Sequence, residues 1–344
     1  MGITKTAVRR NEAMELFKLM ASILVVFIHV KFPGRVGSVT VSLARVAVPV
    51  FLAISGWFSF GTKPDRLLKR LGHILLLFVV AVTAAAVLGC PVAMHRGTAP
   101  VDFLRGFVPG TKSLSMTMLT HESGFPCTGY TWYLIAAAFC YLVLYVYVRF
   151  FGEQTPDYRP LYFVAAVLLT ANFLMGEMGR PLDVGVPYQL QRNGLFLGLP
   201  MFTLGIFLRE YRERIMKNFA LTDGKLLLLL LAGVALTLLQ WKGTGTGELP
   251  PGTVIQLVAL MLLMAAHPDL KCPWAGIAGG VSTVVYLLHF PLIGVYEAFL
   301  LPLIPLGAGV ESWLRPVFVA SLSILLGIAW VMIRAGAVSL RKKK

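Results

Sequence analysis

The chain has 344 residues, of which 57% are hydrophobic and 14% are charged, whereas a soluble domain carries about 25% charged residues. This composition excludes an ordinary soluble protein and predicts an all-α integral membrane protein. The net charge of +15 would indicate a nucleic-acid partner in a soluble protein, but here the basic residues stand in short clusters between apolar runs. We therefore expect the lipid bilayer, and no nucleic acid, as the partner of these clusters.

Breaks between the apolar runs predict about ten transmembrane helices in a single domain that covers residues 1–344. The expected spans are 14–31, 41–60, 72–91, 131–149, 160–176, 193–208, 225–241, 252–267, 281–301 and 315–335. With the amino terminus in the cytoplasm, twenty Lys and Arg residues fall on cytoplasmic segments and nine on external segments. The positive-inside rule then predicts that both termini are cytoplasmic.

Basic residues before the first apolar run, namely Lys5, Arg9 and Arg10, imitate the start of a signal peptide. No small-residue cleavage site follows the run, and the run carries polar residues that a disposable segment would not need. We therefore expect it to remain as the first membrane span.

Four polar residues of the first span share one face of the helix: Glu15, Lys18, Ser22 and His29. At 100° per residue they fall within an arc of about 60°, and this face must look into protein or water because lipid would penalise it. Glu15 and Lys18 could equally be an i,i+3 ion pair near the cytoplasmic interface. His29 lies about 21 Å further along the axis, where it could accept a proton or be an interfacial histidine.

The second span places Arg45 at a depth similar to that of His29, because it runs back toward the cytoplasm. Pro49 removes a helix hydrogen-bond donor and can kink this span, which ends near Ser55. The Arg45 side chain could bind a carbonyl oxygen or a phosphate, or it could brace the bundle.

The longest external segment covers about residues 91–130. Its ionisable residues include His95, Asp102, His121 and Glu122. A loop of this length is often functional, and a structured cap without chemistry is an equal alternative. Cys90 and Cys127 fall on this side, so a disulfide between them is permitted. None of the four cysteines forms a C-x-x-C pair, so no metal site is expected.

Several ordered blocks resemble the acyltransferase 3 family of membrane proteins. The blocks are Glu15-Leu16-Phe17-Lys18 with His29, Arg45-Val46-Ala47-Val48-Pro49-Val50-Phe51 with Ser55-Gly56, Lys69-Arg70, Trp132-Tyr133-Leu134, Arg192-Asn193-Gly194-Leu195-Phe196-Leu197-Gly198-Leu199-Pro200 and Tyr286-Leu287-Leu288-His289. They cover about residues 9–335, and the resemblance also implies ten spans. Lys18 and His73 depart from the pattern, since arginine is usual at both positions, and these changes bear on the contacts with the donor.

The resemblance implies an acyltransferase that uses acyl-CoA, expected to be acetyl-CoA, as a co-substrate and holds no cofactor tightly. The implied acceptor is a hydroxyl of a glycan, a peptidoglycan precursor or a lipid-linked sugar, at the outer face of a bacterial cytoplasmic membrane. In this hypothesis His29 is the general base, Arg45 stabilises the oxyanion, and Glu297, the acid nearest in depth, orients His29. The donor or substrate path would include Glu15, Lys18, Ser22, Ser55, Arg70, Trp132, Arg192, Tyr286 and His289. Nucleotide phosphates could bind Arg66, Lys69, Arg70, Arg209, Arg212 and Arg214.

Other interpretations remain open at this point. Tyr286 and His289 could simply hydrogen-bond across helices, and Trp132 could belong to an interfacial aromatic belt. A polar stripe would also line the pore of a transporter or exporter of a small polar solute or glycan precursor, and an inactive membrane scaffold is a third reading. A homo-oligomer is compatible with the sequence, which does not determine the oligomeric state.

Overall fold

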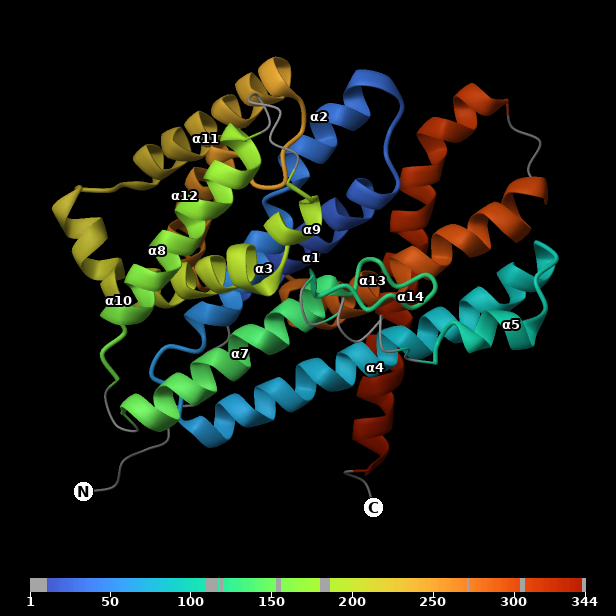
Figure 1. Ribbon diagram of the computed structural model, residues 1–344, viewed down its shortest axis with the longest axis horizontal. Helices are drawn as coiled ribbons and strands as arrows, with labels where there is room; N and C mark the ends of the chain where they lie inside the picture. The colour runs from blue at the N-terminus through green and yellow to red at the C-terminus, as the bar shows by residue number, and fades with distance from the viewer. Residues whose placement is uncertain are drawn as a thin grey trace.

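The computed structural model describes residues 11–108, 110, 117, 120–152, 156–179, 186–270, 272–303 and 307–341, and every regular element within them is a helix (Figure 1). The basic clusters before residue 11 and after residue 341 lie outside this part of the chain. The α-helices are α1 (Glu12–His29), α2 (Gly34–Ala44), α3 (Ala47–Trp57), α4 (Pro64–His95), α5 (Pro100–Arg105), α7 (Trp132–Phe151), α8 (Arg159–Phe173), α9 (Tyr188–Gln191), α10 (Leu199–Asn218), α11 (Asp223–Thr244), α12 (Pro251–Ala266), α13 (Ala275–Val295) and α14 (Ala308–Arg341). Shorter π or 3-10 segments extend some of them: η1 (Leu174–Met178), η2 (Gly194–Gly198), η3 (Tyr296–Leu300) and η4 (Leu301–Leu303).

Each of the ten expected spans coincides with a helix or with two consecutive helical segments. Among the described residues, seven helical segments are long and apolar enough to cross a membrane. The expected spans outside that set are α1 and α10, which carry several charges, and α12, which has 16 residues. The prediction of an all-helical membrane protein is therefore confirmed, while the number of spans and the side of the termini stay predictions.

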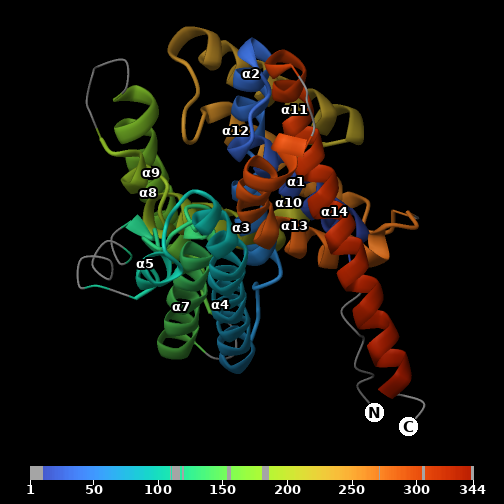
Figure 2. The ribbon, with the colours of Figure 1, turned by 90° about the vertical axis from the view of Figure 1, so that its right-hand side faces the viewer.

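Helices at the periphery expose apolar side chains, whereas the central helices bury theirs. In the most apolar stretches of α4 and α11 only 17% of the residues are buried, against 61% in the segment formed by α2 and α3. An apolar surface of this extent is stable in lipid and not in water. Figure 1 shows α4 and α7 side by side in the lower part of the molecule, and Figure 2 shows the carboxyl-terminal half of α14 standing clear of its neighbours. Helix α1 lies in the interior, in contact with α13, α2 and α3.

Prolines interrupt two of the central helical segments. Pro49 has no N–H group to offer the carbonyl oxygen of Arg45, and α2 ends at Ala44 before α3 begins at Ala47. The expected kink is therefore a complete break that places Arg45 between two short helices. The second break in the backbone hydrogen-bond pattern is at Pro291 within α13. It leaves the carbonyl oxygen of Leu287 without its helical donor.

Glycines bring α3 and α10 into close contact. A Cβ atom added to Gly56 would lie 1.8 Å from the carbonyl oxygen of Phe202, and one added to Gly205 would lie 1.9 Å from that of Ala53. Helix backbones in membranes approach this closely only where small residues face each other. The crossing fixes the carboxyl-terminal half of α3 against α10.

The external segment is partly helical, because α4 continues to His95 and α5 follows it. Most of residues 109–119 lie outside the described part of the chain. Cys90 and Cys127 both carry free thiols, so the permitted disulfide is not formed.

The close crossing of α3 and α10 predicts that Gly56→Ala lowers the stability of the protein. The new methyl group must push two backbones apart, and overpacking of this kind costs roughly 1–3 kcal/mol. The measurement is the thermal unfolding midpoint of the purified protein in detergent. Gly72→Ala in α4 is the matched control, because a Cβ atom there meets no atom within 4 Å. An unchanged midpoint for Gly56→Ala would contradict the close crossing.

Candidate functional site

Four cavities form a series through the bundle, and each shares lining residues with the next. The basic cavity, of about 600 Å³, shares Phe58 and Arg70 with a middle cavity of about 280 Å³. The middle cavity shares Tyr133 with a small cavity of about 40 Å³. The small cavity in turn shares His29 with an outer cavity of about 240 Å³. The cavity of smallest volume in the series is therefore one that His29 lines.

The basic cavity lies among helix ends and loops that the sequence predicts on the cytoplasmic side. Its cations are Lys63, Arg66, Arg70, Arg209 and Arg212. The Arg209 guanidinium lies 5.3 Å from the ring centre of Trp57. Arg70 donates hydrogen bonds to the carbonyl oxygen of Phe58 and to the hydroxyl of Ser59. Cations and aromatic rings together suit a ligand that has both phosphates and a planar ring.

The middle cavity receives the inner end of the polar stripe on α1. Lys18 and Ser55 line it, and the Lys18 ammonium pairs with the Glu15 carboxylate at 2.8 Å. The i,i+3 ion pair, the alternative interpretation of these two residues, is therefore present, and Lys18 also lines the cavity. Ser22 is buried and donates to the carbonyl oxygen of Leu19, and it is not among the lining residues of the four cavities. Two residues of the stripe, Lys18 and His29, thus line cavities of the series.

The small cavity contains the break between α2 and α3. Arg45 lines it, and its guanidinium makes a two-pronged ion pair with Glu248, at 3.0 and 2.9 Å. Within the described residues the Nε atom of Arg45 is buried and has no hydrogen-bond partner. The arginine is therefore neutralised and held in place, while its Nε–H group is available to bind a further acceptor.

Aromatic rings and a second arginine complete the wall of the small cavity. Arg192 pairs with Glu122 at 3.1 Å, and its guanidinium lies 5.3 Å from the ring centre of Trp132 and 4.6 Å from that of Tyr188. Burial lowers the pKa of the neighbouring His121 below its usual value. His121 is thus neutral near pH 7, and its Nδ1 atom accepts a hydrogen bond from the N–H group of Gly194 at 2.9 Å.

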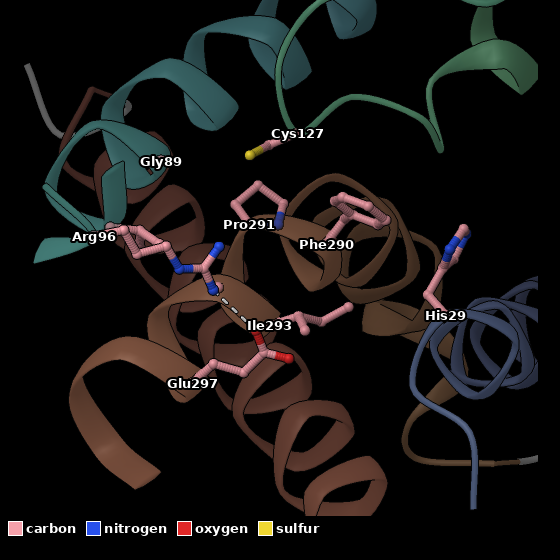
Figure 3. Close-up of a pocket in the computed structure, with 10 residues that line it drawn as sticks. His29, Gly89, Arg96, Cys127, Phe290, Pro291, Ile293 and Glu297 are labelled. Atoms are coloured by element: carbon pink, nitrogen blue, oxygen red, sulfur yellow. Dashed lines mark hydrogen bonds and ion pairs between the residues drawn. The ribbon is translucent and has the colours of Figure 1, made fainter. Parts of the chain in front are cut away.

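His29 is the last residue of α1, and it lines both the small cavity and the outer cavity. Figure 3 shows it at one end of the outer cavity. Its ring centre lies 5.3 Å from that of His289 and 5.2 Å from that of Phe290. Glu297, predicted to orient His29, lies across the outer cavity from it, as Figure 3 shows. The Glu297 carboxylate binds two arginines instead, Arg96 at 3.0 Å and Arg315 at 3.2 Å. The prediction that Glu297 orients His29 is corrected on this geometry, because these arginines hold the carboxylate away from the imidazole.

Two tyrosines clamp α13 to the segment before α7. The Tyr130 hydroxyl donates to the carbonyl oxygen of Leu287 at 2.7 Å, and so supplies the hydrogen bond that Pro291 cannot. The Tyr286 hydroxyl donates in return to the carbonyl oxygen of Tyr130 at 2.6 Å. Tyr286 therefore both lines the small cavity and holds the kinked part of α13 in place.

Glu248 and Tyr130 are the main site residues that sequence reasoning missed. Glu248 lies in the loop between α11 and α12, and it is an isolated acid outside every expected span. Its proximity to Arg45 has no signal in the local sequence. Tyr130 had one available signal, because a proline in a membrane helix implies a hydroxyl donor elsewhere. In the described residues no group of three or more His, Cys, Asp and Glu side chains could hold a metal ion.

Comparison with known proteins gives one match. The model of the acyltransferase 3 family, described as an acyltransferase domain, matches residues 11–334. No curated protein and no solved structure matches the chain.

The ion pair between Arg45 and Glu248 predicts a large stability effect for Glu248→Gln. Both side chains are mostly buried, with 16% and 15% of their surface exposed, and removal of one partner from a buried pair costs about 3–5 kcal/mol. The thermal unfolding midpoint in detergent should therefore fall markedly. Asp102→Asn is the control, since its pair with Arg105 is exposed and is worth at most about 1 kcal/mol.

A double variant distinguishes destabilisation by an unpaired buried charge from destabilisation by lost contacts. Arg45→Met together with Glu248→Leu leaves no buried charge, so it should unfold at a higher temperature than Glu248→Gln alone. A double variant less stable than the single variant would refute this account of the pair.

Proposed function

This chain belongs to the acyltransferase 3 family, and from that premise we propose that it transfers an acyl group, in the first instance acetyl, from cytoplasmic acyl-CoA to a hydroxyl on the opposite side of the membrane. The observation that carries this proposal is the series of cavities, in which His29 stands between the last two. We place the protein in a bacterial cytoplasmic membrane, with the basic cavity inward. The excess of Lys and Arg on that side supports this orientation.

The donor fits the basic cavity by charge and by shape. Of the six basic residues considered for phosphate binding, Arg66, Arg70, Arg209 and Arg212 line it. Lys63 is a fifth cation there, while Lys69 and Arg214 are exposed and do not belong to the lining. The guanidinium groups would bind the phosphates of CoA, and the aromatic rings beside them would pack against its adenine.

The narrow part of the series fits the rest of the donor. A pantetheine arm is thin, and in this proposal it extends through the middle cavity, past Lys18 and Ser55, to the small cavity. A cavity of about 40 Å³ suits a small acyl group and is small for an intact sugar. This dimension favours group transfer over export of a solute.

The chemical step needs a group that accepts a proton from the acceptor and then donates it to the departing CoA. We assign both roles to His29. Its imidazole takes the proton from the acceptor hydroxyl while the oxygen attacks the carbonyl carbon of the thioester. A C–O bond forms, the C–S bond breaks, and His29 returns the proton to the departing thiolate of CoA. The products are an acyl ester and CoA with a free thiol, and His29 is neutral again.

Arg45 suits the carbonyl oxygen of the donor. Negative charge develops on that oxygen during attack, and the unpartnered Nε–H group of Arg45 is a fixed donor in a cavity it shares with His29. Because Glu248 already balances the guanidinium, a neutral thioester can bind beside it without a net buried charge.

The acceptor fits the outer cavity. This cavity has His29 at one end and the pair of Arg96 with Glu297 at the other, with Phe290 and Pro291 between them (Figure 3). A sugar hydroxyl placed at His29 would leave the rest of the ring against Phe290 and its outer hydroxyls near the ion pair. A glycan, a peptidoglycan precursor or a lipid-linked sugar therefore remains the proposed acceptor class.

His29→Ala tests the base. The variant should insert into the membrane normally and lose about 10²–10⁴-fold in transfer rate, which is what general bases contribute. The assay follows a labelled acetyl group from acetyl-CoA into membrane glycan and lipid fractions. His267→Ala is the matched control, because His267 is exposed, pairs with Asp223 and lines none of the four cavities. Undiminished transfer by His29→Ala would exclude the assigned base, and solute flux without any transfer would favour the exporter.

Arg212→Ala tests the donor site. Loss of one arginine contact to a phosphate should raise the KM for acyl-CoA about tenfold with little change in kcat, because the lost contact is the same in ground and transition states. Lys69→Ala and Arg214→Ala remove the same charge outside the cavity lining and should leave the KM unchanged. Equal effects in all three variants would indicate a general surface potential in place of a bound nucleotide.

A further inference from the structure

His289 of α13 is fully buried and has one ring nitrogen without a partner. Its Nδ1 atom lies 3.1 Å from the carbonyl oxygen of Val285 and 2.8 Å from that of Tyr286. Carbonyl oxygens only accept hydrogen bonds, so Nδ1 carries the proton and Nε2 of the neutral ring carries a lone pair. In the part of the chain that the structure describes, Nε2 is buried and accepts no hydrogen bond.

A buried acceptor without a donor requires an explanation, because it costs about 1–3 kcal/mol. The rings around His289 are those of Tyr130, Tyr286, Phe290 and His29. Tyr130 and Tyr286 have already committed their hydroxyl hydrogens to carbonyl oxygens, and Phe290 has none to give. His29 is the ring among these four that still has an N–H group to offer.

We propose that His289 is a positioning residue for His29, whose ring donates a hydrogen bond to the Nε2 atom of His289 during the reaction. This inference rests on the proposed function of His29 as the base. The contact would fix the tautomer of His29, so that its unprotonated nitrogen faces the acceptor hydroxyl, and it would hold the imidazolium that forms after proton transfer. Carboxylates and main-chain carbonyl groups orient catalytic histidines in this way in other sites.

The imidazole rings of His289 and His29 differ in how firmly hydrogen bonds hold them, as this role requires. His289 is locked by two hydrogen bonds to its own helix, whereas His29 makes no hydrogen bond within the described residues and lines cavities on two sides. With ring centres 5.3 Å apart, rotation of the His29 side chain can bring the two nitrogens together. Catalytic hydrogen bonds are often long in the free enzyme and shorten when substrate binds.

The charges around the pair explain why the acceptor is an imidazole. Arg45 and Arg192 line the small cavity together with His29. A lone pair held close to the His29 ring would stabilise the imidazolium that forms beside these two cations. The Nε2 atom of His289 supplies that lone pair. Because the ring is neutral, it would not form an ion pair with Arg45 or Arg192.

Two conservative variants of His289 distinguish positioning from a structural role. The amide oxygen of glutamine can replace the Nε2 acceptor, whereas asparagine places its amide near Nδ1 and keeps only the bonds to the helix. We expect His289→Gln to keep kcat within a few-fold of the wild type. His289→Asn should lose about 10- to 100-fold in kcat at unchanged KM for acyl-CoA, less than loss of the base itself. A structural role alone predicts the reverse order, and that result would overturn the proposal.

A spectroscopic measurement decides the proposal independently of transfer activity. The full-length protein is labelled with ¹⁵N histidine, and the His29 signals are those missing from His29→Ala. The tautomer populations of His29 should change in His289→Asn and persist in His289→Gln, with equal unfolding midpoints showing that both variants are folded. Unchanged His29 signals in His289→Asn would reject the contact. A wild-type protein without transfer activity would count against the proposed function, while the spectra would still accept or reject the contact.

Discussion

A helix that crosses a membrane must satisfy its own backbone hydrogen bonds, and two prolines prevent the central helices of this protein from doing so. In hydrocarbon an open carbonyl group is tolerated only where protein or a polar cavity covers it. The break before Pro49 falls at Arg45, a residue that lines the small cavity. The break before Pro291 is covered by the hydroxyl of Tyr130. The positions of the two prolines therefore determine where a polar site can exist inside the bundle.

Charge balance is the second constraint on this site. Three cations along the series of cavities have carboxylate partners: Glu15 of the same helix for Lys18, and Glu248 and Glu122 of distant segments for Arg45 and Arg192. These pairs lower the cost of the buried charges, and they also decide which donors stay available. Arg45 binds Glu248 through its two terminal nitrogens, and among the described residues its Nε atom has no hydrogen-bond partner.

The sequence predicted which residues belong to the site better than it predicted which side chains they contact. Helical periodicity placed His29 and Lys18 on one face, and the positions of the apolar runs matched the helices, because both follow from local spacing. The same argument included Ser22, whose hydroxyl turns back to its own helix, since periodicity gives the direction of a side chain and not its hydrogen bond. Depth alone suggested Glu297 as a partner of His29, yet two arginines hold that carboxylate across the cavity. Contacts such as Arg45 with Glu248 join residues 203 positions apart, and no local pattern encodes them.

The arrangement also explains why a histidine in place of an acid stands behind His29. Arg45 and Arg192 line the small cavity together with His29. A carboxylate beside His29 would be attracted to these arginines, as Glu297 is to Arg96 and Arg315, and an ion pair of that kind would make it a weaker acceptor for the imidazole. The neutral ring of His289 is not attracted in this way, and its Nδ1–H is already tied to two carbonyl oxygens of α13. In a site enriched in arginine, an uncharged acceptor is therefore the one that stays directed at the base.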